Sequence, residues 1–239
     1  MGNVVLMGLA AGLGTCLGAL LVLLFGRLRY RTFSLLLGLA AGVMLAVILC
    51  DLLPAALYRG RLSQCFSGVF TGLFFVGAID FLFSQEAPAN GYHRRYLALG
   101  YLIALGVAIH DLPEGLAIAA GYTEPLTLGP LLTLAIGLHN IPEGMASAAP
   151  LRAGGISVGR VLAINLLVSM VTPLGSALGV LLIDLSPKLI SFLLAFAGGA
   201  MSYIVFLKLL PESFRHHRFS AVSGISLGVA FVTSLNLFL

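Results

Sequence analysis

Long apolar runs follow one another along almost the whole chain. Hydrophobic residues make up 59% of its 239 residues and charged residues only 9%, and the mean hydropathy is +1.07. A soluble domain carries about 25% charged residues, so this chain could not cover a water-facing surface. A helix that crosses the roughly 30 Å core of a bilayer needs about 20 apolar residues. The chain is therefore predicted to be an integral membrane protein.

Charged and turn residues divide the chain into eight runs that are long enough to span a bilayer. Their hydrophobicity does not alternate as it would in barrel strands, and glycine recurs within them, as it does where membrane helices pack closely. We therefore expect an all-α membrane protein with eight transmembrane helices in a single domain, residues 1–239. The predicted spans are approximately Val4–Phe25, Phe33–Leu57, Ser63–Phe83, Tyr96–Ala120, Leu126–Ala149, Ser157–Ile183, Pro187–Leu210 and Phe219–Phe238.

Basic residues are unevenly distributed between the loops on the two sides of these spans. Because cytoplasmic loops carry the excess of basic residues, the richer side is expected in the cytoplasm, with both termini outside and the protein in the cell membrane. No loop gathers a dense basic cluster, so the bilayer, and not nucleic acid, is the expected partner. The richer side holds Arg27, Arg29, Arg31, Arg94, Arg95, Arg152, Arg160, Arg215 and Arg218, and the other side holds Arg59, Arg61 and Lys188.

Three blocks of sequence recur in the same order near the start and the end of the chain. Corresponding spans are five apart, an odd number, so the second copy would be inverted across the bilayer. We expect a 3+2+3 arrangement, with a first repeat over about 1–84, two central helices over about 96–149 and a second repeat over about 157–239. The matching blocks are Thr15–Leu20 with Thr172–Ala177, Ala40–Pro54 with Ala197–Pro211, and Ser67–Val76 with Ser223–Val232.

The two central spans carry one polar motif, HDLPEG at His110–Gly115 and HNIPEG at His139–Gly144. In each copy a histidine and a glutamate are four residues apart, so they share a helix face, and the residue after the histidine shares it too. If the two spans face each other, all these side chains converge. Nitrogen and carboxylate ligands suit divalent first-row metals, most often zinc. The candidate metal ligands are His110, Asp111, Glu114, His139, Asn140 and Glu143.

Each motif also contains a proline and a glycine. Pro113 and Pro142 lack an N–H, so each frees a backbone carbonyl that either lines an ion path or accompanies an ordinary packing kink. Gly115 and Gly144 are expected to allow close contact between the two motif-bearing spans.

Carboxylates in these spans are costly without a cation. Each mid-span carboxylate costs about 2.5–3.5 kcal/mol on insertion, so Asp111, Glu114 and Glu143 together approach about 10 kcal/mol. Neither span contains a lysine or arginine that could pair with them. A bound dication in a wet cavity is the simplest compensation, and protonated carboxyl groups are the alternative. For a lone histidine, a polar contact between helices would suffice, but the duplicated motif favours metal ligation.

The motif does not match a zinc enzyme. A metalloprotease would place two histidines and a glutamate in the order HExxH on one helix, whereas here the partner four residues on is glutamate. Nothing marks an intramembrane hydrolase, since no nucleophile or base accompanies the ligands, and there is no Walker A motif for ATP-driven transport. We therefore expect a secondary metal-ion transporter and no enzyme. A membrane metal sensor and a transport-inactive relative are the alternatives.

At these residues the chain resembles the ZIP family of divalent-metal transporters, and most of all its bacterial GufA-like branch. The resemblance covers essentially the whole chain. It implies transport of Zn²⁺, or of a similar ion such as Fe²⁺, Mn²⁺ or Cd²⁺, into the cytoplasm, and a homodimer. The segments that carry it are HDLPEG, HNIPEG, TPLGSALG in the sixth span and GGAMSYIVFLKLLPES in the seventh.

The resemblance also implies a two-metal centre. In it, His110, Glu114, His139 and Glu143 would hold the transported ion. An adjacent second site would be formed by Asp111 and Asn140 with the bridging glutamates.

Several positions depart from the family's pattern or lie outside the motif. Thr172 replaces a glutamate of many relatives, so the second metal site is expected to be weaker, absent or differently selective. Leu207 and Lys208 stand where relatives carry a histidine or glutamate at the exit, and this lysine would repel an emerging dication unless it pairs with Glu212 or Asp51. Asp51 is the candidate entrance ligand, with a water-exposed interfacial charge as the alternative.

Overall fold

The computed structural model describes the chain as a bundle of long helices. All regular structure within the described residues is helical. Arg27, one of the basic residues used above, lies outside them. The described residues are 2–24, 26, 28–85, 91–122, 128–181 and 186–238.

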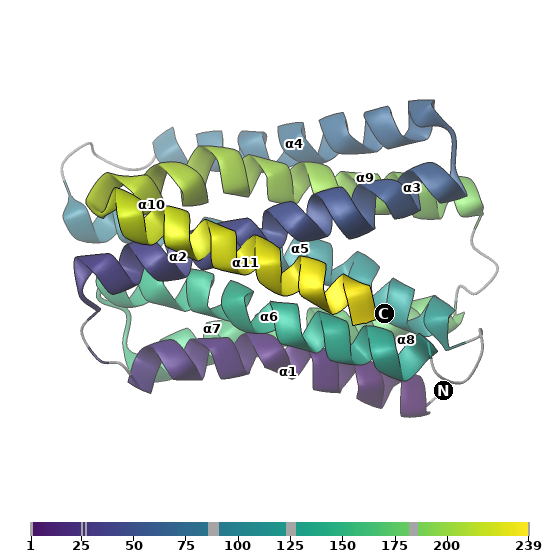
Figure 1. Ribbon diagram of the computed structural model, residues 1–239, viewed down its shortest axis with the longest axis horizontal. Helices are drawn as coiled ribbons and strands as arrows, with labels where there is room; N and C mark the ends of the chain where they lie inside the picture. The colour runs from purple at the N-terminus through teal and green to yellow at the C-terminus, as the bar shows by residue number, and fades with distance from the viewer. Residues whose placement is uncertain are drawn as a thin grey trace.

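The helices run back and forth along the long axis of the bundle (Figure 1). Several consecutive elements join into single rods, so that the second, sixth and seventh predicted spans each consist of more than one element. The elements are α1 (Gly2–Leu24), α2 (Tyr30–Ala46), η1 (Val47–Leu52), α3 (Leu53–Arg59), α4 (Leu62–Gln85), α5 (Tyr92–Gly121), α6 (Leu128–Ala153), α7 (Val158–Ser169), α8 (Val171–Leu181), α9 (Pro187–Ile204), η2 (Val205–Leu209), α10 (Leu210–His216) and α11 (Arg218–Phe238).

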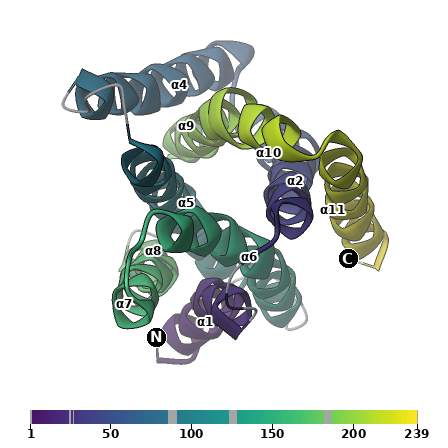
Figure 2. The same cartoon turned by 90° about the vertical axis from the view of Figure 1, so that its left-hand side faces the viewer.

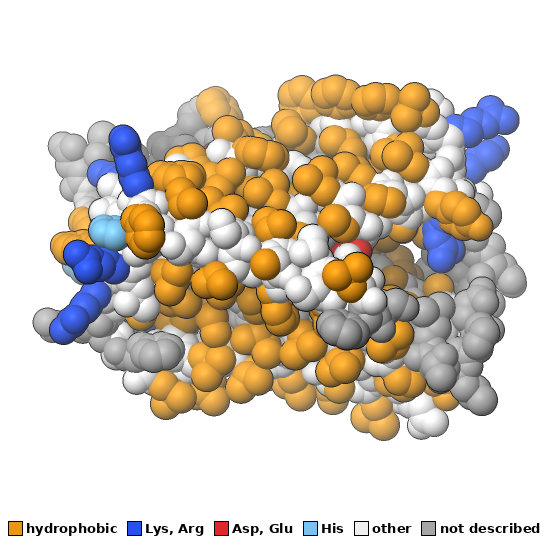
Figure 3. Space-filling view, in the orientation of Figure 1, with side chains coloured by type: hydrophobic (Ala, Val, Ile, Leu, Met, Phe, Trp, Pro, Cys, Tyr) orange, Lys and Arg blue, Asp and Glu red, His pale blue; other side chains and the backbone are white. Residues whose placement is uncertain are grey.

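Seven rods of the described part of the chain are long and apolar enough to cross a membrane. The exception among the predicted spans is α6, which has 26 residues but carries the second polar motif, and this motif lowers its mean hydropathy. In the space-filling view a broad apolar band lies between two ends that carry lysine and arginine (Figure 3). The fold is that of a multi-pass membrane protein, as predicted.

The two ends of the bundle are named here by their arginines. The Arg95 end holds the first residues of α2 and α5 and the last residues of α10. The Arg59 end holds the last residues of α3, and both chain termini lie toward it (Figure 1).

The two motif-bearing helices lie in the middle of the bundle. Seen along the axis, α5 and α6 separate a group formed by α1, α7 and α8 from one formed by α2, α9, α10 and α11 (Figure 2). The most extensive helix contacts are α1 with α6, α5 with α8, α2 with α11, and α4 with α9. Both helices stay α-helical through Pro113 and Pro142.

The motif glycines pack against the flanking helices. A β-carbon on Gly115 would lie 2.2 Å from the carbonyl oxygen of Thr172 on α8, and one on Gly144 would lie 2.0 Å from that of Thr15 on α1. The expectation that these glycines bring α5 and α6 together is therefore wrong. They bring each motif helix against its outer neighbour, because a glycine lets two helix backbones touch.

Two π-helical turns interrupt the second and seventh rods. The turn η1 comes directly before Leu53 and Pro54, and η2 comes directly before Leu210 and Pro211. Proline cannot donate the regular helix hydrogen bond, which favours such a local rearrangement in the preceding turn. The two π turns occupy matching places in the recurring sequence blocks.

Candidate metal site

Two reciprocal contacts join α5 and α6 at the centre of the bundle. His110 Nε2 on α5 lies 2.8 Å from Glu143 Oε2 on α6, and His139 Nε2 on α6 lies 2.8 Å from Glu114 Oε1 on α5. The helices are antiparallel, so the Glu114–His139 pair lies nearer the Arg59 end and the His110–Glu143 pair nearer the Arg95 end. Four residues of helix separate the pairs by about 6 Å along the axis.

Asp111 joins the pair nearer the Arg95 end. His110 Nε2 lies 3.5 Å from Asp111 Oδ1 and 3.9 Å from Glu114 Oε1. These three residues offer ligand atoms that all lie within 4.8 Å of one another, and all three are buried. A histidine nitrogen and carboxylate oxygens in such a group are the donor set that zinc accepts.

The ring of His110 is oriented by the backbone. Its Nδ1 donates a hydrogen bond of 3.0 Å to the carbonyl oxygen of Gly106. Metal-ligating histidines characteristically donate their second nitrogen in this way, which fixes the tautomer. With Nδ1 as one donor, the 2.8 Å between Nε2 and the Glu143 carboxylate is a hydrogen bond, and a metal ion bound by Nε2 would take the place of its proton.

Several oxygen atoms of the site lack partners. Among the described residues no lysine or arginine forms an ion pair with these carboxylates. A buried oxygen without a partner costs free energy, more so when it is charged, so the geometry calls for a cation. The buried site oxygens without a hydrogen bond are Asp111 Oδ1 and Oδ2, Glu114 Oε2, Asn140 Oδ1 and Glu143 Oε1.

Asn140 and Thr172 lie toward the flanking helices. The Asn140 amide nitrogen donates to the carbonyl oxygen of Ala11 on α1 at 3.2 Å, and its acceptor oxygen, Oδ1, has no hydrogen-bond partner among the described residues. Thr172 on α8 is fully buried, and its hydroxyl has no hydrogen-bond partner among the described residues.

A cavity of about 460 Å³ reaches the site from the Arg59 end. Glu114 and His139 line it, together with Asp51, Asn236 and Arg59. In the space-filling view an acidic side chain is visible inside a hollow toward that end (Figure 3). The pair nearer the Arg59 end therefore borders the cavity, whereas His110 and Glu143 are fully buried behind it.

Asp51 lies on η1 and faces this cavity. Its Oδ1 accepts a hydrogen bond of 2.7 Å from the side-chain amide of Asn236 on α11. Sequence analysis singled out Asp51 but missed Asn236, because nothing in the sequence of α11 indicates which helix it packs against.

Lys208 pairs with neither partner proposed for it. Its amine lies 2.6 Å from Asp80 Oδ2 on α4, and the Tyr203 hydroxyl donates to the same oxygen at 2.7 Å. Glu212 and Asp51 were the two partners considered from the sequence, and Lys208 pairs with Asp80 instead. Helix α4 packs extensively on α9, the helix before η2, and Asp80 on α4 forms one cluster with Lys208 and Tyr203.

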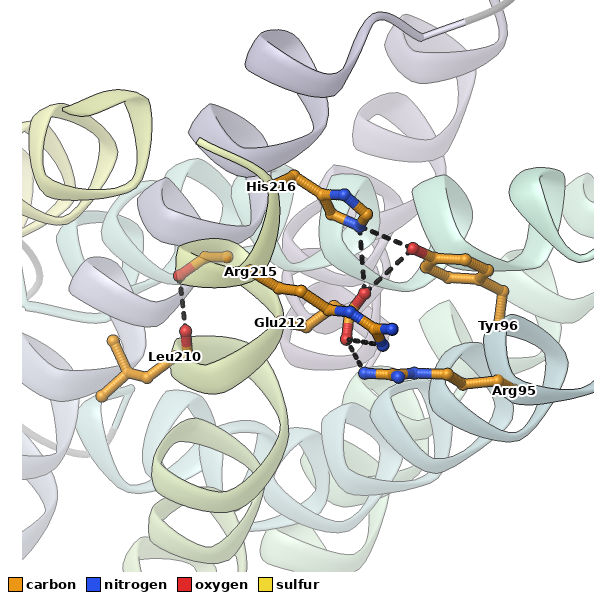
Figure 4. Close-up of polar contacts among 7 residues, drawn as sticks. Arg95, Tyr96, Leu210, Glu212, Arg215 and His216 are labelled. Carbon is orange, nitrogen blue, oxygen red and sulfur yellow. Dashed lines mark hydrogen bonds and ion pairs between the residues drawn. The ribbon is translucent and has the colours of Figure 1, made fainter. Parts of the chain in front are cut away.

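Glu212 is buried at the Arg95 end, far from Asp51 at the other side of the metal site. Its carboxylate is surrounded by Arg95 and Tyr96 from α5 and by Arg215 and His216 from its own helix (Figure 4). From the sequence, Arg95 was expected only as one of the basic residues that orient the chain and Tyr96 only as the start of a span.

The chain is similar over nearly its whole length to proteins named as zinc transporters. A family model described as ZIP Zinc transporter matches residues 85–236. The chain is 36% identical to the zinc transporter ZupT of Chlorobium phaeovibrioides, covering 98% of this chain and 96% of that protein. It is 32% identical to the zinc transporter GufA of Myxococcus xanthus over 90% of each chain. It is 30% identical to the zinc transporter ZTP29 of Arabidopsis thaliana, covering 98% and 93%.

Proposed function

The chain belongs to the ZIP zinc transporter family, and on that premise we propose that it is a secondary transporter that moves divalent metal ions, above all Zn²⁺, across a membrane. One observation carries the proposal. Three buried carboxylates and two imidazoles meet between α5 and α6, and no lysine or arginine of the described chain pairs with them. A dication is the partner that their charge and their donor atoms fit.

The ion would be held by the two reciprocal pairs. It would first meet Glu114 and His139 at the cavity and then pass about one helix turn deeper to His110 and Glu143. Asp111 and Asn140 supply the further oxygens for an adjacent second site. Thr172 brings a hydroxyl where the family resemblance implies a glutamate in many relatives, so we propose that the second site binds more weakly.

The membrane arrangement that we propose has eight spans in an inverted 3+2+3 plan. Helix α6, the fifth in chain order, is added to the seven apolar rods. The reciprocal packing supports it, because α1 contacts α6 as α8 contacts α5, and α2 contacts α11 as α9 contacts α4. The glycine contacts follow the same rule, since Gly144 meets Thr15 and Gly115 meets the matching Thr172. The two π turns, each before a proline, supply a third correspondence.

We propose that transport runs from the Arg59 end to the Arg95 end, which is uptake into the cytoplasm. The concentration of basic residues at the Arg95 end supports this orientation, with both termini outside. Asp51 would serve as the entrance ligand, because its carboxylate faces the cavity that leads to Glu114 and His139. We also propose that the protein forms a homodimer. Light scattering of the purified protein measures the molecular mass that tests this.

Zinc uptake into proteoliposomes that contain the purified chain tests the function. His110→Ala and Glu143→Gln should each weaken zinc binding by about 100-fold or more and slow uptake accordingly, whereas Ser202→Ala should not, because among the described residues Ser202 bonds only to Gly198 of its own helix. Uptake that survives both site substitutions would refute the site. Competition by Fe²⁺, Mn²⁺ and Cd²⁺ in the same assay measures selectivity.

The second candidate function is a metal sensor or a transport-inactive relative. Thr172 and Lys208, which replace metal-ligating residues of relatives, are the features that favour it. Zinc binding by the purified chain without uptake would identify this function.

A further inference from the structure

The Arg95 end of the bundle is closed by a polar cluster centred on Glu212 (Figure 4). The Glu212 side chain is buried, and the Tyr96 hydroxyl of α5 donates to its Oε1 at 2.9 Å. Arg95, the neighbouring residue on α5, pairs with its Oε2. His216 and Arg215 approach the carboxylate from α10 at 3.2 and 4.0 Å. The carboxylate therefore joins a metal-site helix to a helix of the opposite group.

Aromatic rings extend the cluster to a third helix. The His216 ring stacks on Tyr30 of α2 with 5.3 Å between centroids. Phe33 of α2 meets the edge of Tyr96 at 5.5 Å, and Tyr96 also meets Tyr92 at 4.6 Å. The cluster thus holds α2, α5 and α10 together at one end of the bundle.

An apolar plug lies between this cluster and the metal site. A β-carbon on Gly106 would lie 1.7 Å from Ile204 Cδ1, so the Ile204 side chain fills the surface of α5 directly above that glycine. The Gly106 carbonyl is the one that accepts from His110. Ile204, Ile103 and Met201 are fully buried in one core. The cavity reaches the metal site from the Arg59 end, whereas plug and cluster fill the Arg95 side.

The cluster is suited to open. An ion that leaves toward the Arg95 end has to pass between α5 and the group of α2 and α10, so the bonds of Tyr96 and Arg95 to Glu212 must break. The Arg95 side chain is 51% exposed, so water can replace its carboxylate partner when the helices separate.

We propose that Glu212, held by Tyr96 and Arg95, is the centre of a polar latch that keeps the Arg95 end closed while the metal site is open to the Arg59 end. This inference rests on the proposed transport function. Glu212 is a positioning residue, because it acts through the contact between α5 and α10. The two arginines beside its carboxylate oppose the alternative that Glu212 and His216 bind the departing metal ion.

A buried reporter cysteine tests the latch. Ile204→Cys is placed in a chain whose native cysteines, Cys16, Cys50 and Cys65, are replaced by alanine. A membrane-impermeant maleimide is then applied without zinc to right-side-out and inverted vesicles, and the labelling rate is measured. Reagent that arrives at the Arg95 end should label the parent protein slowly, because plug and latch cover residue 204.

Opening the latch should speed this labelling. Tyr96→Phe keeps the ring contacts and removes the hydroxyl, and Glu212→Gln removes the charge. Each should raise the rate from the Arg95 end about tenfold, since a hydrogen bond to a charged group is lost. Ser213→Ala is the matched control, because Ser213 is buried next to Glu212 but, within the part of the chain that the structure describes, bonds only to Leu210 of its own helix.

Unchanged rates in both Tyr96→Phe and Glu212→Gln would overturn the latch. Zinc could instead slow the labelling of the reporter, and His216→Ala could abolish this protection. If the labelling rates of Tyr96→Phe and Glu212→Gln are also unchanged, this result would overturn the latch in favour of a metal site. The labelling requires no zinc, so an absence of zinc uptake would refute the proposed function without changing this result. Tyr96→Phe removes only a hydroxyl and keeps the core volume. It therefore still tests the latch if Glu212→Gln fails to fold.

Discussion

The imidazole of His110 and the carboxylate of Glu143 lie 2.8 Å apart across two different helices, and His139 and Glu114 repeat this relationship in reverse. Each helix therefore supplies half of each pair. Neither α5 nor α6 can bury its charged groups favourably without the other. Binding of a cation and docking of these two helices are consequently coupled.

Removing either pair should weaken zinc binding strongly. Glu143→Gln and Glu114→Gln each delete one anionic ligand, and we expect zinc affinity to fall by about 100-fold or more, since even indirect supports of metal ligands contribute about 10–100-fold. Isothermal titration calorimetry of the purified chain measures it. Ser147→Ala is the control. It removes a buried hydroxyl, one helix turn beyond Glu143, and this hydroxyl donates to Asn165. Equal zinc affinity in all three variants would contradict the assignment.

The motif glycines should tolerate no side chain. In Gly115→Ala and Gly144→Ala the new methyl group would meet a backbone carbonyl at 2.2 or 2.0 Å. Helices must then move apart, at a cost of about 1–3 kcal/mol. The apparent melting temperature should fall for both variants and stay unchanged for Gly159→Ala, where nothing lies within 4 Å. A melting temperature of Gly144→Ala equal to that of Gly159→Ala would refute the close packing of α6 on α1.

Lys208 and Asp80 should depend on each other. Lys208→Met leaves a partly buried carboxylate without its cation, and Asp80→Asn leaves the amine without its anion, so each should destabilise the chain by about 1–3 kcal/mol. The double variant should recover part of this loss, because no unpaired charge remains. Thermal unfolding of the parent, the two single variants and the double variant gives the coupling free energy between Lys208 and Asp80. Additive losses would mean that the pair contributes nothing.

Asp51 should govern access to the site more than the passage of the ion. Asp51→Asn removes the carboxylate from the cavity, so the zinc concentration for half-maximal uptake should rise, by roughly two- to tenfold, while the maximal rate is kept. Asn236→Ala removes a hydrogen bond to Asp51 but leaves its charge, and should have a smaller effect. Initial uptake rates at a series of zinc concentrations test this. A loss of maximal rate alone would assign Asp51 another role.

The long apolar helices and the shared face of each histidine–glutamate pair could be predicted from the sequence, whereas most of the contacts between distant helices could not. Apolar runs of sufficient length fix where helices lie, and the spacing of His110 and Glu114 fixes which side chains share a face. In a membrane, however, lipid-facing and buried faces are both apolar, so periodicity does not reveal which neighbour a helix meets. For this reason Asp80 was missed as the partner of Lys208, and the partners of the motif glycines were assigned wrongly.

The π turn η1 also fixes the rotational phase of the rod that contains Asp51. A π turn accommodates one residue more than an α turn does, so everything after Val47–Leu52 is rotated by about 100° relative to an uninterrupted helix. Deleting a single residue within this turn would restore a regular α-helix and leave Ala55 and Arg59 at the cavity wall, whereas regular α geometry at full length would turn both residues away from it. The lining of the cavity is thus determined by the conformation of this one turn as much as by the identity of the residues after it.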